Sequence, residues 1–157
     1  YYIALEDDTS KFETLKDLFK TLSVNQTIIY CNSIKRVIDL SDALMSEGFT
    51  VSCIHSNMEK EERTKRYYDF KSGQSRLLVS TNLTARGIDI QQVSVVVNFD
   101  VPKDVHTYLH RIGRSGRWGR KGTGINFITK RDITYLREIE KYYSTQIQEL
   151  PSSFINN

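Results

Sequence analysis

The sequence predicts an α/β domain with a mainly parallel sheet and helices on both of its faces. Short apolar segments rich in β-branched residues alternate with longer amphipathic segments along the whole chain. The apolar segments are continuous rather than alternating in polarity, which is typical of strands that are buried on both faces. At 157 residues the chain has the length of one domain, and its hydrophobic content of 39% suffices for a buried core. We therefore expect a single domain spanning residues 1–157.

The first half of the chain contains three predicted strand–helix pairs. The helices are indicated by apolar residues at helical spacing, as at Leu15, Leu18 and Leu22. The predicted strands are residues 1–5, 27–32 and 50–55, and the helices that follow them are residues 11–22, 34–45 and 60–71. Gly48 and Gly73 follow the second and third helices and predict where these helices stop.

The second half continues the same alternation. The predicted strands are residues 76–80, 93–100 and 124–129, and the predicted helices are residues 103–112 and 132–143. Pro102 separates the second of these strands from the helix that follows it. Outside this core, residues up to about 10 are expected to form the first strand and a linker. Residues 144–157 are expected to form a tail that packs along the surface.

The composition argues against several classes of protein. The apolar runs are too short and too often interrupted by charge for a membrane span, and the start lacks the layout of a signal peptide. Cys31 and Cys53 lie in apolar runs without a CxxC pair, which predicts buried, reduced thiols and an intracellular protein. Because the chain does not begin with Met, we expect it to be part of a longer protein.

Positive charge is concentrated in one segment. The net charge of +3 is too small to indicate nucleic-acid binding by itself. No carboxylate lies between Asp104 and Asp132, however, whereas this segment and its border carry several cations. These cations are Arg111, Arg114, Arg117, Arg120, Lys121, Lys130 and Arg131. Such a field is suited to binding phosphate.

Glycine and arginine each recur at every third residue in "HRIGRSGRWGRKG", residues 110–122. Taken alone, this pattern is compatible with a flexible basic arm, a solvated basic loop or a preformed turn that holds an anion. The strand predicted at 124–129 disfavours the flexible arm. Two further polar loops, "NS" at 32–33 and "TNLTARGID" at 81–89, directly follow predicted strands. Ligands of parallel sheets bind beyond the carboxyl ends of the strands, so we expect the three segments to share one edge.

These segments resemble the motifs of one enzyme family. "STNLTARGIDI" followed by "HRIGRSGR" resembles motifs V and VI of the DEAD-box RNA helicases, "TIIYCNS" is similar to motif IV, and "EERTKRYYDFKSG" to the motif between IV and V. "NFDVP" matches the element before motif VI. The resemblance covers essentially the whole chain and implies the second RecA-like domain of the helicase core, a three-layer sandwich. Within the family, "GRKGTGINF" and "IEKYYSTQIQELP" look most like translation initiation factor 4A.

The resemblance implies contacts with ATP. Arg114 and Arg117 correspond to the family's arginine fingers, which reach the γ-phosphate from across the interdomain cleft. A guanidinium is always charged and matches the geometry of phosphate oxygens. Gly116, between them, would let the backbone approach the nucleotide. In "TARGID", Gly87 and Asp89 match nucleotide-binding positions, and Asp89 would accept a hydrogen bond from the ribose; the alternative for Asp89 is a structural cap.

The resemblance also implies contacts with RNA. Ser33, Arg63 and Thr81 correspond to residues that hold the sugar–phosphate backbone. Two hydroxyls and a guanidinium would give affinity without sequence specificity. Without the motif pattern, Arg63 would be interpreted as a solvated charge on a helix.

Three residues are expected to couple nucleotide binding to domain closure. Arg86 would brace the motifs through a salt bridge, and His110 and Arg111 begin motif VI. His106 and His110 are also four residues apart on a predicted helix, a spacing that could hold a metal, but no third ligand lies nearby and we predict no metal site.

The chain departs from the family pattern at a few positions. Asn82 follows Thr81 where many members have Asp, and Trp118 replaces Tyr or Phe. "HSN" at 55–57 stands where many members have His-Gly-Asp, and the missing glycine disfavours a close backbone approach to RNA there. We interpret His55 as a polar residue at a strand end.

The chain has no GxxxxGK(S/T) phosphate loop and no Asp-Glu-Ala-Asp sequence. The resemblance implies ATP with Mg²⁺ as the cofactor, with the metal held by an N-terminal RecA-like domain that is absent from this chain. We therefore expect the isolated domain to have negligible ATPase or unwinding activity.

The implied partners are single-stranded or short duplex RNA, the N-terminal domain and helical-repeat scaffold proteins, without a membrane. The implied role is unwinding of short RNA duplexes in translation initiation, in the cytoplasm, with a nuclear location as the alternative. The other function that we consider is an interaction module that acts mainly by binding scaffold proteins, in messenger-RNA decay or storage or another RNA process.

Overall fold

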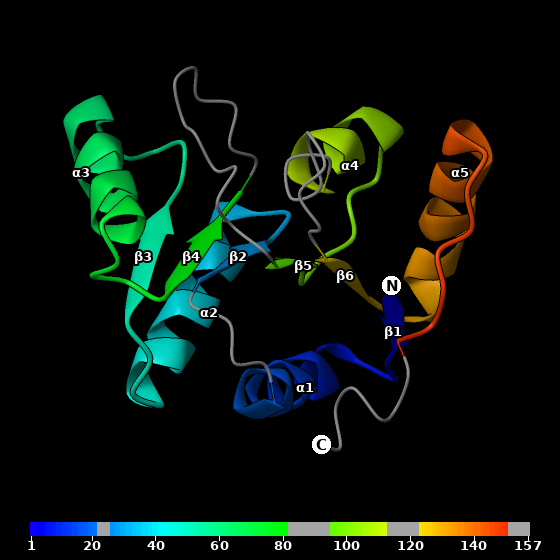
Figure 1. The fold of residues 1–157 in the computed structure, drawn as a ribbon, viewed down its shortest axis with the longest axis horizontal. Helices are drawn as coiled ribbons and strands as arrows, with labels where there is room; N and C mark the ends of the chain where they lie inside the picture. Colours follow the sequence, from blue (N-terminus) through cyan, green and yellow to red (C-terminus); the bar gives the residue numbers. More distant parts are fainter. Residues whose placement is uncertain (22–25, 82–94, 113–122, 151–157) are drawn as a thin grey trace.

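The computed structural model describes residues 1–21, 26–81, 95–112 and 123–150 (Figure 1). Six parallel strands form one sheet in the order β1-β6-β5-β2-β4-β3. The strands are β1 (Tyr2–Ala4), β2 (Thr27–Tyr30), β3 (Val51–Ile54), β4 (Leu77–Ser80), β5 (Val95–Asn98) and β6 (Thr123–Ile128). The prediction of a mainly parallel sheet is confirmed, and every pairing in the described residues is parallel.

Helices cover both faces of the sheet, as predicted. They are α1 (Asp8–Thr21), α2 (Ile34–Ser46), α3 (Lys60–Lys71), α4 (Val105–Ile112) and α5 (Ile133–Tyr143), with a 3₁₀ turn, η2 (Lys130–Asp132), before α5. Helices α1 and α2 lie on one face, and α3, α4 and α5 on the other (Figure 1).

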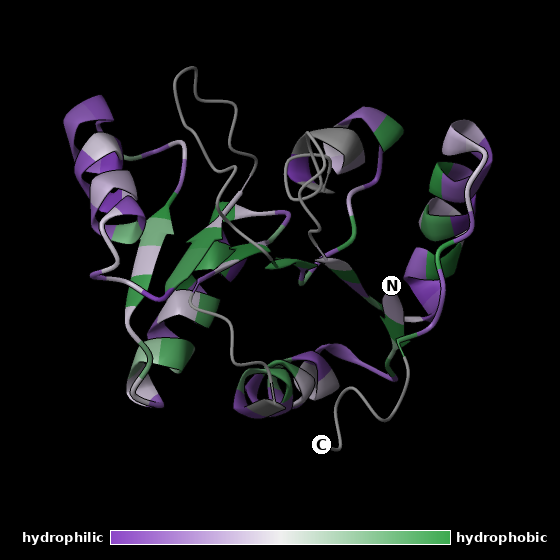
Figure 2. Cartoon of the chain, viewed as in Figure 1, coloured by the Kyte–Doolittle hydropathy of each residue, from purple (hydrophilic) through white to green (hydrophobic). Residues whose placement is uncertain are grey.

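Burial on both faces explains the continuous apolar strands. In β2, Ile29 packs with α1 and α2 whereas its neighbour Ile28 packs on the opposite face with Phe70 of α3, and both isoleucines are fully buried. Figure 2 shows the apolar residues gathered on the strands, while α3 is mostly hydrophilic and buries Phe70 alone. Cys31 and Cys53 are free and buried, which confirms the prediction of buried thiols.

Most element boundaries differ from the sequence prediction by one to three residues, and at the starts of two helices a hydrogen bond explains the difference. Helix α1 begins at Asp8 rather than at residue 11, because the Asp7 carboxylate accepts a hydrogen bond from the Ser10 N–H at 3.0 Å and caps the first turn. The predicted linker is therefore shorter. Before α5, the Asp132 carboxylate accepts a hydrogen bond from the Thr129 N–H at 2.9 Å, which closes η2 and delays the α-helix by one residue.

The described part of the tail, residues 144–150, runs along the outer edge of the sheet, where five of its residues are exposed and two reach the core. Ser144 adopts a left-handed conformation, with φ of 50°, that ends α5 and turns the chain back. The Tyr2 N–H then donates to the Gln148 carbonyl at 2.8 Å, and the Leu150 N–H donates to the Tyr2 carbonyl at 2.9 Å. Ile147 and Leu150 are buried as a result. The tail thus covers the outer edge of β1.

Among the helices of the described residues, none combines the length and the apolar character that crossing a membrane requires.

Candidate nucleic-acid and nucleotide interface

Two predicted RNA-binding hydroxyls lie at the ends of neighbouring strands. Ser33 follows β2 and is the N-cap of α2, where its Oγ accepts a hydrogen bond from the Arg36 N–H at 3.2 Å. Thr81 follows β4, whose last residue, Ser80, is paired with Tyr30 of β2. Because β2 and β4 are parallel and adjacent, the two hydroxyl residues lie on the same edge of the sheet.

Arg63 lies on the first turn of α3, which follows β3, the neighbour of β4. Its backbone N–H donates to the Glu59 carbonyl at 3.0 Å, and the residue is exposed. The three predicted RNA-binding residues therefore come from segments that follow three neighbouring strands, β2, β4 and β3. The structure places them along one edge of the sheet, with Ser33 exposed and Thr81 half-buried.

Arg111, the second residue of the predicted motif VI, is 2% exposed. Its guanidinium donates to the Asp100 carbonyl at 2.9 Å, the Asn32 Oδ1 at 2.9 Å and the Asn98 Oδ1 at 3.2 Å. It also lies over the Tyr30 ring, 5.2 Å from the centroid. Burial lowers the pKa of Arg111 to about 10, so the side chain remains charged at neutral pH. Arg111 therefore ties α4 to the carboxyl ends of β2 and β5.

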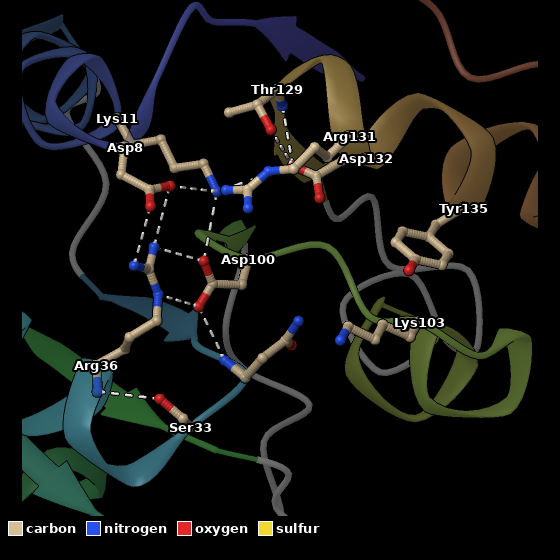
Figure 3. Close-up of a pocket in the computed structure, with 11 residues that line it drawn as sticks. Asp8, Lys11, Ser33, Arg36, Asp100, Lys103, Thr129, Arg131, Asp132 and Tyr135 are labelled. Atoms are coloured by element: carbon tan, nitrogen blue, oxygen red, sulfur yellow. Dashed lines mark hydrogen bonds and ion pairs between the residues drawn. The ribbon is translucent and has the colours of Figure 1, made fainter.

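Asp100, two residues beyond β5, is the centre of a cluster of ion pairs (Figure 3). Arg36 of α2 donates to both oxygens of this carboxylate, at 2.6 and 2.7 Å, and the Lys11 ammonium of α1 lies 3.3 Å away. The Asn32 N–H also donates to it, at 3.0 Å. Asp8 extends the cluster, 3.4 Å from Lys11 and 3.3 Å from Arg36. The cluster joins the starts of α1 and α2 to the ends of β2 and β5.

The cations and the carboxylates in this cluster stabilise one another in their charged forms. Burial would raise the pKa of the Asp100 carboxyl, but the hydrogen bonds from Arg36 and the Asn32 N–H and the charge of Lys11 outweigh burial and lower it. Lys11 is 3% exposed, so its ammonium depends on the surrounding carboxylates for compensation.

We expect Asp100→Asn to remove a pH-dependent part of the stability. Between the lowered pKa of folded Asp100 and its ordinary pKa of about 3.9, the unfolded chain binds more protons. The free energy of unfolding therefore rises with pH across this window, and the stabilisation is lost as the pH falls through the folded pKa. Urea unfolding at pH 6 and pH 3 should show a smaller difference between the two pH values in Asp100→Asn than in the wild type.

Asp8→Asn is the matched control, because its side chain is 49% exposed in the same cluster. It should change the free energy of unfolding at pH 6 by at most about 1 kcal/mol. If the free energy of unfolding of Asp100→Asn depended on pH as in the wild type, Asp100 would not be the source of this pH dependence.

Several predicted site residues cannot be placed. Arg86, Gly87 and Asp89 lie outside the described residues, as do Arg114 and Arg117. For His110 the structure describes the backbone, within α4, but not the side chain. The predicted roles of these six residues stay predictions.

Sequence reasoning missed Lys11 and Arg36, which resemble ordinary surface cations on amphipathic helices. The available signal was Asp100, a carboxylate directly after the most continuous apolar strand, in "NFDVP". His55 lies one residue beyond β3, as expected. His106 is exposed and contacts the Tyr142 ring, with 5.7 Å between the ring centroids. In the part of the chain that the structure describes, no group of three or more His, Cys, Asp or Glu side chains is placed to hold a metal.

Comparison with known proteins identifies the family. The family profile "Helicase conserved C-terminal domain" matches residues 10–119. A solved structure of the C-terminal domain of the DEAD-box protein Dbp5 superimposes with a TM-score of 0.85 at 38% identity, covering 97% of this chain and 89% of that one. The chain belongs to the DEAD-box helicase C-terminal domain family. The predicted family and the predicted RecA-like fold are both confirmed.

This DEAD-box domain is also similar to full-length helicases. It is 50% identical over 153 residues to ATP-dependent RNA helicase eIF4A of Kluyveromyces lactis, covering 98% of this chain and 39% of that protein. It is 52% identical over 151 residues to ATP-dependent RNA helicase FAL1 of Pyricularia oryzae, covering 96% of this chain and 38% of that protein. The domain thus spans about two fifths of the length of these relatives.

Two further solved structures resemble the DEAD-box domain. Saccharomyces cerevisiae Dbp5 bound to RNA and ADP BeF3 has a TM-score of 0.88 at 38% identity, covering 96% of this chain and 41% of that one. The Escherichia coli DEAD-box protein SrmB, bound to regulator of ribonuclease activity A, has a TM-score of 0.83 at 32% identity, covering 98% of this chain and 91% of that one.

Proposed function

We propose that this domain is the C-terminal half of an ATP-dependent RNA helicase that unwinds or remodels short RNA duplexes. The observation that carries the proposal is the alignment of Ser33, Thr81 and Arg63 along one edge of the sheet, in a domain of the DEAD-box family. The relatives named above as ATP-dependent RNA helicases support it, as does the Dbp5 structure with RNA and ADP BeF3.

The RNA contacts would be made with the backbone. Hydroxyl and guanidinium groups donate hydrogen bonds to phosphate and sugar oxygens, which every nucleotide presents alike. The domain would therefore bind single-stranded RNA without sequence preference, and its affinity would fall as the salt concentration rises.

The nucleotide contacts would be made by Arg114 and Arg117 at the γ-phosphate and by Gly87 and Asp89 at the rest of the nucleotide. Arg111 fits this role as a positioning residue, because it is held by the ends of β2 and β5 and directly precedes the glycine-arginine segment. ATP would supply the phosphoryl group that is transferred, and Mg²⁺ would supply positive charge that offsets the negative charge of the phosphate oxygens. We propose that the metal is held by the N-terminal domain, so the isolated chain would not turn over ATP.

ATP and RNA would act together to close two domains on each other. Each ligand would contact both domains only in the closed arrangement, so both favour it. Loss of the γ-phosphate contacts after hydrolysis would reopen the cleft and release the RNA.

We expect Arg63→Ala and Thr81→Val in the full-length protein to raise the KM for RNA in the ATPase reaction about tenfold each, since each removes a hydrogen bond to a charged phosphate. The kcat at saturating RNA should be retained, because these contacts bind RNA rather than ATP. The measurement is ATP turnover against the concentration of single-stranded RNA.

Lys65→Ala is the matched control, an exposed cation on the same helix as Arg63, and it should leave the KM unchanged. Turnover that does not respond to RNA at all would overturn the helicase proposal. An unchanged KM in both variants would overturn the assignment of these residues.

Translation initiation, in the cytoplasm, is the cellular role that we propose, on the similarity to eIF4A. Because FAL1 of Pyricularia oryzae is equally similar, complementation of a strain depleted of its own initiation factor is the direct test.

A second candidate function is docking of a scaffold protein of the helical-repeat type. The SrmB structure supports docking of a protein partner, without indicating its type, because the chain bound to a protein regulator there corresponds almost entirely to this domain. Arg114→Ala with Arg117→Ala separates the two functions, since it would stop ATP turnover and leave scaffold binding unchanged.

A further inference from the structure

A pocket of about 310 Å³ opens at the carboxyl edge of the sheet (Figure 3). It lies toward β5 and β6, whereas Thr81 and Arg63 follow β4 and β3 on the other side of β2. It is formed where the segments after β2, β5 and β6 meet the starts of α1, α2 and α5. Its lining is almost entirely polar: Asp8, Lys11, Asn32, Ser33, Arg36, Asp100, Lys103, Thr129, Arg131, Asp132 and Tyr135. Ser33, a predicted RNA-binding residue, forms part of its rim.

The three carboxylates in the lining are already engaged. Asp8 and Asp100 are paired with Lys11 and Arg36. Asp132 accepts hydrogen bonds from the Thr129 N–H at 2.9 Å and from its hydroxyl at 3.0 Å, and it lies 4.0 Å from Lys11. The negative charges of the three carboxylates are thus balanced by groups that themselves line the pocket.

Two cations in the lining are not engaged by any of the described residues. Lys103, before α4, and Arg131, in η2, are exposed and have no ion pair or hydrogen bond with the described residues. Figure 3 shows the ammonium of Lys103 and the guanidinium of Arg131 directed toward the interior of the pocket. The lining as a whole holds one more cation than carboxylates. The hydroxyls of Ser33 and Tyr135 add hydrogen-bond donors.

We propose that this pocket binds a phosphate group between Lys103 and Arg131. A phosphate presents several acceptor oxygens and negative charge, which match these two cations and the hydroxyl donors. Because Ser33 lies on the rim, the phosphate belongs to the RNA strand, whose path would continue from Ser33 across the ends of β5 and β6. This assignment to RNA rests on the proposed function. The other source of the same chemistry is a small polyphosphate.

The test uses residues 1–157 and two-dimensional ¹H–¹⁵N NMR. Tripolyphosphate and a short oligouridylate are titrated separately at constant ionic strength. Lys103→Gln with Arg131→Gln removes the two cations that are proposed to bind the phosphate. Lys130→Gln with Lys141→Gln is the matched control, because both lysines are exposed, carry the same charge and do not line the pocket. All four positions are on the surface, and dispersed spectra establish that the variants fold.

We expect saturable shifts of the Ser33, Lys103 and Arg131 amides, with a Kd that is about tenfold weaker in the pocket variant and unchanged in the control. Shifts with oligouridylate that compete with those of tripolyphosphate assign the phosphate to RNA. Shifts with tripolyphosphate alone support the pocket and assign it to a small polyphosphate. No saturable shift, or equal weakening in both double variants, would overturn the proposal. RNA-stimulated ATP turnover is measured separately. A pocket that binds no phosphate would therefore not contradict the helicase proposal.

Discussion

Replacing both Arg114 and Arg117 with Ala in the full-length protein should reduce RNA-stimulated ATP turnover by about 10³ to 10⁵, the range attributed to an arginine finger. The physical reason is that negative charge on the transferred phosphoryl group must be stabilised as the bond to the leaving oxygen breaks. A guanidinium held in position does this without reorganisation of solvent. The measurement is steady-state ATP turnover at saturating single-stranded RNA, with each single variant beside the double variant.

RNA binding has to be measured in the same variants, because a loss of turnover through weaker RNA binding would have another cause. Fluorescence anisotropy with labelled RNA in the absence of ATP should give a Kd close to that of the wild type. Arg137→Ala, which removes a 55% exposed guanidinium from α5, is the control and should keep full turnover. Turnover within tenfold of the wild type in the double variant would exclude the arginine-finger assignment and favour the scaffold-binding function.

Replacing Arg111 with Met should lower the free energy of unfolding by about 2–4 kcal/mol, because buried oxygen acceptors lose their donor. Those acceptors are the side-chain oxygens of Asn32 and Asn98 and the Asp100 carbonyl. Burial of the guanidinium itself costs free energy, as the lowered pKa of Arg111 indicates, and removing that cost limits the net loss. Urea unfolding of residues 1–157 measures the change, provided that the slope stays constant.

Arg111→Lys should recover only part of this stability. An ammonium keeps the charge but lacks the planar fork that spans separate acceptors. Arg66→Met is the matched control: Arg66 is 38% exposed and pairs with Glu62 one turn away on α3. It should cost no more than about 0.5 kcal/mol. If Arg111→Met cost as little as Arg66→Met, Arg111 would not anchor α4.

Much of the fold follows from local patterns in the sequence. The run Val95–Val97 is apolar without alternation because each of its residues is buried on one face or the other, which is also what makes a parallel sheet predictable. Residues 60–71 were predicted as a helix, and α3 has these bounds. The signal for its end was Gly73, which adopts a φ of 88° in the structure. The start of α1 at residue 8 and the burial of Ile147 and Leu150 were missed because they depend on capping by Asp7 and on contacts with β1.

The candidate site also contains residues that the sequence predicts and residues that only the structure reveals. Ser33 and Thr81 could be expected at one edge from the sequence alone, since the segments that follow parallel strands meet at the same edge of a sheet. Lys11 gave no such signal. Its partner Asp100 is 89 residues away in the sequence, and no local pattern connects an amphipathic helix with that carboxylate.

The sequence by itself determined the strands and helices, the parallel sheet and the motifs that identify the DEAD-box family, because these depend on side-chain periodicity and on short contiguous segments. Only the tertiary structure decided that Lys11, Arg36 and Asp100 form one ion-pair cluster and that Lys103 and Arg131 line the same pocket. The physical reason is the strand order. With β5 placed between β6 and β2, the segment after β5 lies between the starts of helices that are distant in the sequence.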